Sequence, residues 1–189
     1  MTEMELIEQL KRGDELAFKK IVELNQDLVY NTILGIVQQE TEAEDLTQDV
    51  FIKVFENISS FKGESKFSTW IYRIAFTKAL DFLRSRKRKK RFGFLQSYFS
   101  NENADADQIK DFHHPGIKTE NKERSVILFR AIDKLPVTQK AAFTLHKLEG
   151  LSYREISEVM ETTVPAVESL MSRANMNLRK HLEEYYKVH

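Results

Sequence analysis

Apolar residues recur every three to four positions over most of this chain, which is the spacing that amphipathic helices require. One such run extends from Glu15 to about Gln38, and Asp14 directly before it is a favourable N-cap residue. Gly13 can close a shorter helix over residues 3–12. The pattern therefore predicts helices from the first residues onward, and we expect these two to supply core without chemistry.

A helix with two different faces is predicted between Thr41 and about Ile58. Thr41-Glu42-Ala43-Glu44 has the form of a capping box, with a hydroxyl at the N-cap and a glutamate three residues later. The polar face contains Ile52, which indicates either a partner surface or an ordinary exposed side chain. The buried stripe that we expect comprises Ala43, Leu46, Val50, Val54 and Phe55.

Residues 61–91 combine a glycine-containing polar loop, an aromatic helix and a strongly basic end. Seven of the eight residues from Arg84 to Arg91 are Lys or Arg, and cationic runs bind nucleic acids because each neutralised phosphate releases a counterion. Phe67, Trp70 and Tyr72 precede this run, and unpaired bases stack on such rings. The alternative is an amphipathic core helix with a solvated basic tail, which this stretch alone leaves open.

No sustained period is present between Phe92 and Asn121, a stretch rich in Asn, Asp and Ser that contains the turn signal Pro115-Gly116. We interpret residues 92–121 as a linker of about thirty residues between two small helical modules. Such a linker reaches roughly 100 Å when extended but averages about 30 Å as a free coil. We therefore expect the modules to lie close together in the free protein.

Residues 122–189 predict a helix-turn-helix near their end. Ser152-Tyr153-Arg154-Glu155 has a capping-box pattern, and a turn at 161–163 separates its short helix from a longer one with Pro165 in the first turn. The second helix of such a motif enters a DNA major groove, whereas a plain helical hairpin would have no such role. The inward side of that helix would comprise Val167, Met171, Ala174 and Leu178.

The composition favours an all-α fold, because the 189 residues include only 6 Gly and 3 Pro and 41% are hydrophobic. There is no Cys, which excludes disulfides and Cys-ligated zinc. The adjacent His113 and His114 lack helix-spaced carboxylate partners, so we expect neither a metal nor a cofactor. No run approaches ~18 apolar residues and no signal-peptide pattern is present, so we expect a cytoplasmic protein without membrane insertion.

Three stretches together resemble the extracytoplasmic-function (ECF) sigma factors of bacteria over nearly the whole chain. They are AEDLTQDVFIKVFENISSF at 43–61, FKGESKFSTWIYRIAFTKALDFLRSRKRK at 61–89 and LPVTQKAAFTLHKLEGLSYREISEVMETTVPAVESLMSRANMNLRKHL at 135–182. The resemblance implies a transcription initiation factor in which residues 1–91 bind core RNA polymerase and the melted −10 element. Residues 122–189 would read the −35 element of promoter DNA as duplex, and an anti-sigma factor is a further implied partner.

The resemblance also implies which residues make each contact. Polymerase would meet Asp45, Gln48, Asp49, Ile52 and Lys53. A base flipped out of the −10 strand would be held by Lys62, Gly63, Glu64, Ser65, Lys66 and Phe67, and the strand would follow Trp70, Arg73, Thr77, Lys78, Arg84, Arg86, Lys87 and Arg88. The −35 duplex would meet Thr163, Pro165, Ala166, Glu168, Ser169, Ser172 and Arg173.

Two positions depart from the pattern of many relatives. Thr77 stands where they have an Asn that helps to read the flipped base, and Glu168-Ser169-Leu170 lacks the basic residues that flank the serine in them. Glutamate can accept from cytosine N4 but cannot replace arginine on guanine. We therefore expect a −35 sequence unlike the commonest one.

Two other functions remain open from the sequence. A stand-alone regulator would bind duplex DNA through the helix-turn-helix and a different partner through the N-terminal module. A nucleic-acid-processing enzyme is disfavoured, because the sequence has no phosphate-cradling glycine loop, metal-spaced acid/His set or nucleophile–base pair. We therefore expect a protein without enzymatic activity.

Overall fold

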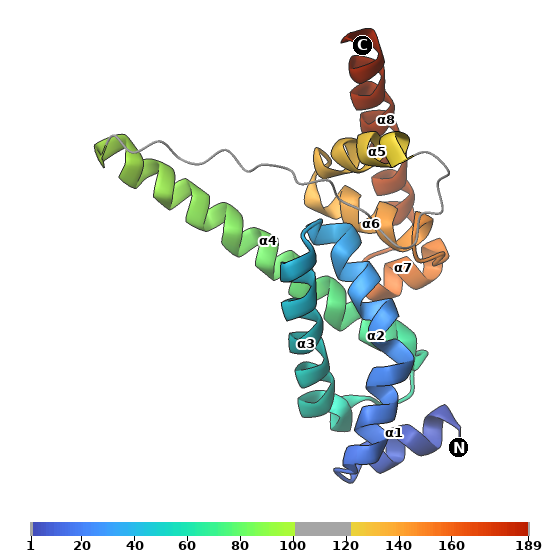
Figure 1. Cartoon of the computed structure of the whole chain (residues 1–189). Coiled ribbons are helices and arrows are strands. Elements are labelled where there is room, and N and C mark those ends of the chain that lie inside the picture. Colours follow the sequence, from blue (N-terminus) through green and yellow to red (C-terminus); the bar gives the residue numbers. More distant parts are fainter. Residues whose placement is uncertain (1, 101–121, 189) are drawn as a thin grey trace.

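A computed structural model describes residues 2–100 and 122–188, with side chains for residues 2–89 and 124–183. Every regular element in this described part of the chain is a helix, which confirms the predicted all-α fold (Figure 1). The elements are α1 (Glu3–Lys11), α2 (Glu15–Val37), α3 (Glu40–Asn57), the 3-10 helix η1 (Ile58–Ser60), α4 (Phe67–Ser100), α5 (Lys122–Asp133), α6 (Val137–Lys147), α7 (Tyr153–Val159) and α8 (Val164–Val188).

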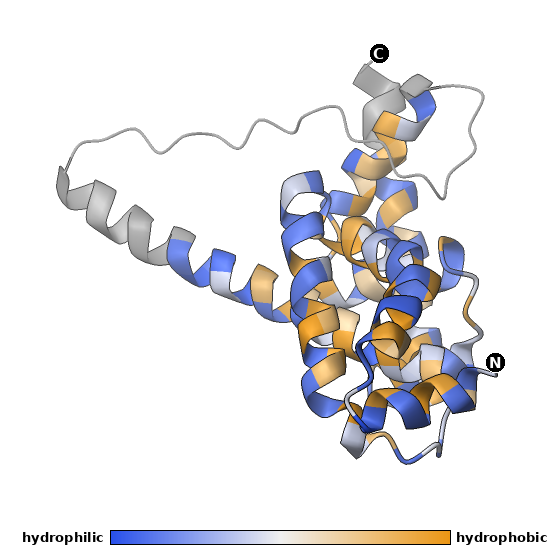
Figure 2. Cartoon of the chain, turned by 60° about the horizontal axis from the view of Figure 1, so that its bottom comes forward, coloured by the Kyte–Doolittle hydropathy of each residue, from blue (hydrophilic) through white to orange (hydrophobic). Residues whose placement is uncertain are grey.

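Helices α2, α3 and α4 pack on one another and form the N-terminal module, with α1 packed on α2 (Figure 1). The core of this module is aliphatic and aromatic, and Ile7, Ile33, Val50 and Ile71 are fully enclosed. Hydrophobic residues gather where the helices face one another, while the outer faces are hydrophilic (Figure 2). The 3.6-residue pattern of the sequence thus corresponds to real buried stripes.

Side-chain caps begin several helices where the sequence predicts them. Asp14 accepts from the backbone N–H groups of Leu16 and Ala17 at the start of α2. The predicted capping box at Ser152 and Glu155 is present at the start of α7. These oxygens satisfy N–H groups that have no partner inside the helix.

The capping box predicted at Thr41 is wrong. Helix α3 begins at Glu40 with Gln39 as its N-cap, and Gln39 makes no side-chain cap hydrogen bond. The cause is the tight connection from α2, which ends in Gln38 with a left-handed φ of 57°. The chain enters α3 two residues early, and acidic Glu40 and Glu42 in the first turn complement the helix dipole instead.

One member of the predicted α3 stripe is also misplaced. Phe55 is 44% exposed, whereas Phe51 is 6% exposed and takes its place in the core. Phe55 instead lies edge-on against Phe18 of α2, with ring centroids 5.1 Å apart. An aromatic ring at the margin of a helix stripe can pack sideways and remain partly solvated.

Helix α4 continues well past the basic run, where a linker was predicted to begin. It extends to Ser100 and projects away from the helical body (Figure 1). No proline interrupts residues 92–100, and a helix that is already formed lengthens at little cost. The rest of the predicted linker, including His113 and His114, lies outside the described residues.

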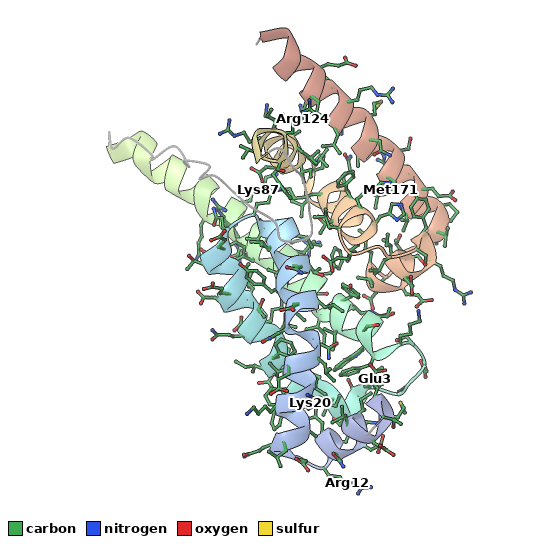
Figure 3. All side chains as sticks on the ribbon, turned by 45° about the vertical axis from the view of Figure 1, so that its right-hand side comes forward. Glu3, Arg12, Lys20, Lys87, Arg124 and Met171 are labelled. Carbon is green, nitrogen blue, oxygen red and sulfur yellow. The ribbon has the colours of Figure 1, made fainter. Side chains whose placement is uncertain are left out.

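Helices α5 to α8 form the C-terminal module, in which α5, α6 and α7 all pack on α8. The predicted helix-turn-helix is present as α7, a turn and α8, and Glu161 in the turn has a left-handed φ of 50°. Met171 points from α8 toward the neighbouring helices (Figure 3). The predicted inward residues of α8 are all buried: Val167, Met171, Ala174 and Leu178.

The two modules pack against each other. Helix α2 contacts α6, and α4 contacts both α6 and α7. At one point of this interface the Thr144 hydroxyl donates to the carbonyl oxygen of Gly35 over 3.3 Å. A Cβ atom at Gly35 would lie 2.6 Å from Cγ2 of Thr144, so glycine is required for this approach.

Candidate polymerase and nucleic-acid interfaces

The five residues predicted to meet polymerase share one exposed face of α3. They are spaced by three or four positions, so they form a stripe along the helix. Ile52 is 55% exposed in the middle of this stripe. Asp49 accepts from Lys78 of α4 over 3.0 Å, and Lys53 pairs with Glu56 over 2.6 Å. The face therefore presents an uncovered apolar side chain among charged groups.

Three aromatic rings form a cluster where the predicted base-holding loop joins α4. The ring centroids of Phe61 and Phe67 are 5.3 Å apart, and Trp70 lies 5.5 Å from Phe61 and 5.7 Å from Phe67. Phe67 is only 2% exposed, whereas Trp70 is half-buried. The ring of this cluster that remains accessible to a base is therefore Trp70, with the two phenylalanines packed against it.

The loop before α4 is exposed and turns at a glycine. Lys62, Glu64 and Lys66 are exposed, and Ser65 is half-buried. Gly63 has a φ of +76°, a backbone conformation that other residues rarely adopt, although a Cβ there would meet no atom. The glycine is needed for the turn and not for space.

Helix α4 continues the cationic surface beyond Trp70. Arg73 and Lys78 are half-buried, while Thr77 is exposed between them. Of the basic run, Arg84, Lys87 and Arg88 are exposed and Arg86 is half-buried. Lys87 lies on the part of α4 that leaves the helical body (Figure 3).

The C-terminal module covers part of this cationic surface. Lys66 Nζ lies 2.8 Å from Glu155 Oε1 of α7. Arg73 donates through one terminal nitrogen to the carbonyl oxygen of Glu158 over 2.9 Å, and its other terminal nitrogen lies 3.3 Å from Glu161 Oε1 in the turn. These pairs join residues of different modules, and the sequence offered no periodic signal from which to predict them.

A tyrosine–glutamate pair lies deeper in the same interface. The Tyr72 hydroxyl of α4 donates to Glu149 Oε2 over 3.3 Å. Burial raises the pKa of Glu149 to about 7, and the hydrogen bond from Tyr72 offsets only part of this effect. Burial, together with the negative charge of Glu149, also raises the pKa of Tyr72.

Glu155 experiences the opposite environment at the edge of the interface. The hydrogen bond from Lys66 lowers the pKa of Glu155 to about 2, with further contributions from the backbone N–H and hydroxyl of Ser152. The same carboxylate therefore closes the capping box of α7 and pairs with a lysine of the other module.

The predicted −35 residues lie at the start of α8 and face outward. Thr163, Pro165, Glu168, Ser169, Ser172 and Arg173 are exposed, and Ala166 is half-buried. Arg173 donates to the Ser169 hydroxyl over 2.8 Å and to the Ser169 carbonyl oxygen over 3.2 Å. Thr163 accepts from the Ala166 N–H over 3.4 Å, a helix cap that the sequence analysis did not predict.

Two other kinds of site receive no support from the described residues. No group of three or more His, Cys, Asp or Glu side chains within them could hold a metal ion. None of the helices in the described ranges is long and apolar enough to cross a membrane.

Comparison with known families identifies both modules. Residues 21–89 match the family model of sigma-70 region 2, and residues 125–178 match that of sigma-70 region 4. The first match covers the α3 face and the cationic surface of α4, and the second covers the helix-turn-helix.

Among curated proteins, the chain is similar to the ECF RNA polymerase sigma-E factor of Haemophilus influenzae, at 32% identity over 97% of this chain and 96% of that protein. It is 32% identical to the RNA polymerase sigma-H factor of Pseudomonas aeruginosa, over 96% of this chain and 94% of the relative. The sigma-E factor of Escherichia coli K12 is also 32% identical, over 92% and 91% of the two chains.

Solved structures support the fold. CnrH in complex with the cytosolic domain of CnrY superimposes with a TM-score of 0.66 at 22% identity, over 95% of this chain and 96% of CnrH. The sigma factor RpoE in complex with the anti-sigma factor NepR from Bartonella quintana gives a TM-score of 0.66 at 20% identity, over 88% and 96% of the chains. These similarities favour a promoter-directing initiation factor over a stand-alone regulator, and the chain belongs to the ECF family of RNA polymerase sigma factors.

Proposed function

We propose that this protein joins core RNA polymerase to its promoters through three separate surfaces. The stripe on α3 docks on polymerase, the aromatic and cationic surface of α4 with its preceding loop captures the melted −10 strand, and the start of α8 reads the −35 duplex. The observation that carries the proposal is the coexistence of these three exposed surfaces on modules that match sigma-70 regions 2 and 4.

At the −10 strand, Trp70 provides the stacking surface. Unpairing a base costs a few kcal/mol, and stacking on an aromatic ring returns about 1–3 kcal/mol per base. Phe67 and Phe61 hold the indole from behind, so Phe67 acts as a support while Lys62 and Lys66 contact the strand. The cations of α4 then follow the phosphates toward Arg88.

At the −35 duplex, the exposed side chains of Glu168, Ser169, Ser172 and Arg173 face base edges. Glu168 can accept from cytosine N4, and Arg173 can exchange its hydrogen bonds with Ser169 for bonds to the duplex. Thr163, Pro165 and Ala166 lie at the helix N-terminus, where backbone N–H groups favour a phosphate. The −35 sequence that this protein recognises should therefore suit an acidic residue, Glu168, at the start of α8 and not a basic one.

The protein contributes specificity and strand capture, while polymerase supplies the chemistry, so no catalytic activity of its own is needed. It acts in the cytoplasm, where polymerase and DNA are located. Two solved structures of similar fold are complexes, one with the cytosolic domain of CnrY and one with the anti-sigma factor NepR. We therefore include an anti-sigma factor among the partners of this chain.

Charge reversal on the α3 stripe tests the polymerase surface. Asp45→Lys combined with Asp49→Lys should abolish co-elution with core RNA polymerase and run-off transcription from fragments of the source genome. A matched reversal on α2, Glu23→Lys with Asp27→Lys, should leave both intact, because these exposed residues lie outside the stripe. Wild-type protein that neither co-elutes nor produces new transcripts would favour the stand-alone regulator.

A further inference from the structure

When the modules are packed, two cationic side chains of the proposed −10 surface already have partners in the C-terminal module. Lys66 is paired with Glu155, and Arg73 contacts the Glu158 carbonyl oxygen and the Glu161 carboxylate. A DNA strand would need the same ammonium and guanidinium N–H groups for its phosphates. The carboxylates of α7 and of the turn therefore compete with a phosphate backbone for these N–H groups.

The interface that holds these groups is specific. Gly35 allows α2 to approach Thr144 of α6, which is fully buried. Tyr72 and Glu149 form a second polar contact away from the exposed ion pairs. A close approach that only glycine permits, combined with a partly buried hydrogen bond, fixes one relative orientation of the modules.

We propose that this arrangement is an autoinhibited state, in which α7 and the turn before α8 take the place of the −10 strand on Lys66 and Arg73. Separation of the modules is then the step that opens the α4 surface to DNA. The proposal rests on the proposed function of that surface and adds its regulation.

The ion pairs of Lys66 and Arg73 are of a strength that a partner can overcome. Exposed ion pairs such as Lys66–Glu155 contribute about 0–1 kcal/mol each. A ligand that binds only the open form shifts the equilibrium by its differential affinity for the two forms. Phosphates that compete for Lys66 and Arg73, or a polymerase surface that holds the modules apart, can therefore open the protein.

A wedge variant tests the proposal without altering any DNA-contacting residue. Gly35→Ala introduces a Cβ 2.6 Å from Cγ2 of Thr144, while alanine itself favours the α2 helix. We expect a larger radius of gyration in X-ray scattering. We also expect at least threefold tighter binding of a fluorescein-labelled thirty-nucleotide single-stranded DNA, measured by anisotropy at low salt without polymerase.

The double variant Gly35→Ala with Thr144→Ser is the matched control. It keeps the added methyl group and the hydroxyl that donates to the carbonyl oxygen of residue 35, but it removes Cγ2, with which the methyl group collides, so it should return to the wild-type radius and affinity. Wild-type protein that scatters as two separated lobes would overturn the proposal. An opened Gly35→Ala protein with unchanged DNA affinity would overturn it equally.

The structure could accommodate the methyl group of Gly35→Ala without separation of the modules. A disulfide variant provides a second test for that case. The chain has no Cys, so Gly35→Cys with Thr144→Cys creates the only possible pair. Oxidation should close the interface and lower affinity for the same DNA at least threefold, and dithiothreitol should restore it. Equal affinity of the oxidised and reduced forms would contradict autoinhibition.

Run-off transcription separates this inference from the function on which it rests. If the protein were not an initiation factor, neither wild type nor Gly35→Ala would produce transcripts with core polymerase. The scattering and DNA-binding comparisons would still decide whether the closed form blocks the α4 surface.

Discussion

Glu149 is a carboxyl group placed where ionisation is costly. It lies in the connection between α6 and α7 and accepts from Tyr72 of α4. The carboxylate of Glu155 in α7 also raises the pKa of Tyr72, as Glu149 does. Burial raises the pKa of Glu149 to about 7, which means that closure of the interface favours its protonated form.

Closure should therefore depend on pH. Opening exposes Glu149 to water and returns its pKa toward the ordinary value of 4.5, so the closed form binds the proton more tightly. The contribution of Glu149 to closure is fully present below pH 4.5, is lost as the pH rises toward about 7, and is constant above that value. The closed/open ratio should change at most about tenfold per pH unit, measured by scattering between pH 5.5 and 8.

Glu149→Gln supplies the control, because the amide oxygen can still accept from Tyr72 but does not titrate. The variant should stay closed across this range. The low pKa of Glu155 affects closure only at more acidic pH, where its pair with Lys66 is lost as the carboxylate is protonated. A slope that persisted in Glu149→Gln would assign the pH dependence to a different group.

Burial of single residues was predicted well in the middle of each stripe and less well at its margins. Val50 and Val54 of the predicted α3 stripe are fully buried. Leu16 is 79% exposed although it belongs to the same apolar run as the buried Ile21. Periodicity locates the face of a helix, but only the neighbouring helix determines how far across that face the core extends.

At the scale of elements, two hydroxyl residues with the same sequence signature behave differently. Ser152 caps α7, whereas Thr41 lies one residue inside α3 and caps nothing. Ser152→Ala should lower the free energy of unfolding by about 1 kcal/mol, because an N-terminal N–H group of α7 loses its acceptor. Thr41→Ala should change it by less than about 0.5 kcal/mol.

Urea denaturation followed by circular dichroism measures both changes. The threonine variant is the matched control, since each substitution removes one hydroxyl near a helix start. Equal destabilisation of the two variants would show that the structural difference between the two sites has no energetic consequence.

The types of nearly all elements could be predicted, but the end of α4 could not. The basic run resembles a solvated tail, and no sequence signal after Arg91 states that the helix continues. Helix ends are fixed by caps or proline, and residues 92–100 contain neither a proline nor a clear terminal motif. In the absence of a stop signal, continuation is the outcome that cooperativity favours.

At the scale of the whole molecule, the sequence predicted two modules but not how they meet. The hydrogen bonds that join the modules link residues 77 to 109 positions apart. Hydrophobic periodicity does not register such contacts, because glutamates on exposed helix faces are ordinary in any helical protein. The residues that we propose for the −10 strand, Lys66 and Arg73 among them, were predicted only through resemblance to a family.

The chain between the two modules must be long enough for them to bind both promoter elements at once. Residues 101–121 span at most ~70 Å when extended, and promoter elements about 25 base pairs apart are ~85 Å apart. Helix α4, 34 residues long, contributes ~50 Å to the path. Deleting residues 102–111 removes ~34 Å and leaves ~86 Å, which spans the two elements only if every remaining residue is fully extended and in line with α4, so run-off transcription should fall more than tenfold.

Core polymerase binding should remain within twofold, because the α3 stripe is untouched. Replacement of residues 102–111 by ten glycines and serines keeps the length and should restore transcription. Full activity of the shortened chain would show that the linker has length to spare.

Glu155 has two roles that a single mutation would remove together, which makes the proposed closed form harder to lose by mutation. The carboxylate that engages Lys66 also completes the first turn of the helix that precedes the DNA-reading helix α8. A mutation that removes this carboxylate to free Lys66 also loosens the fold of the promoter-reading module. Under the proposed autoinhibition, permanently active variants are therefore expected at positions such as Gly35, which lies outside the C-terminal module, and not at Glu155 of α7.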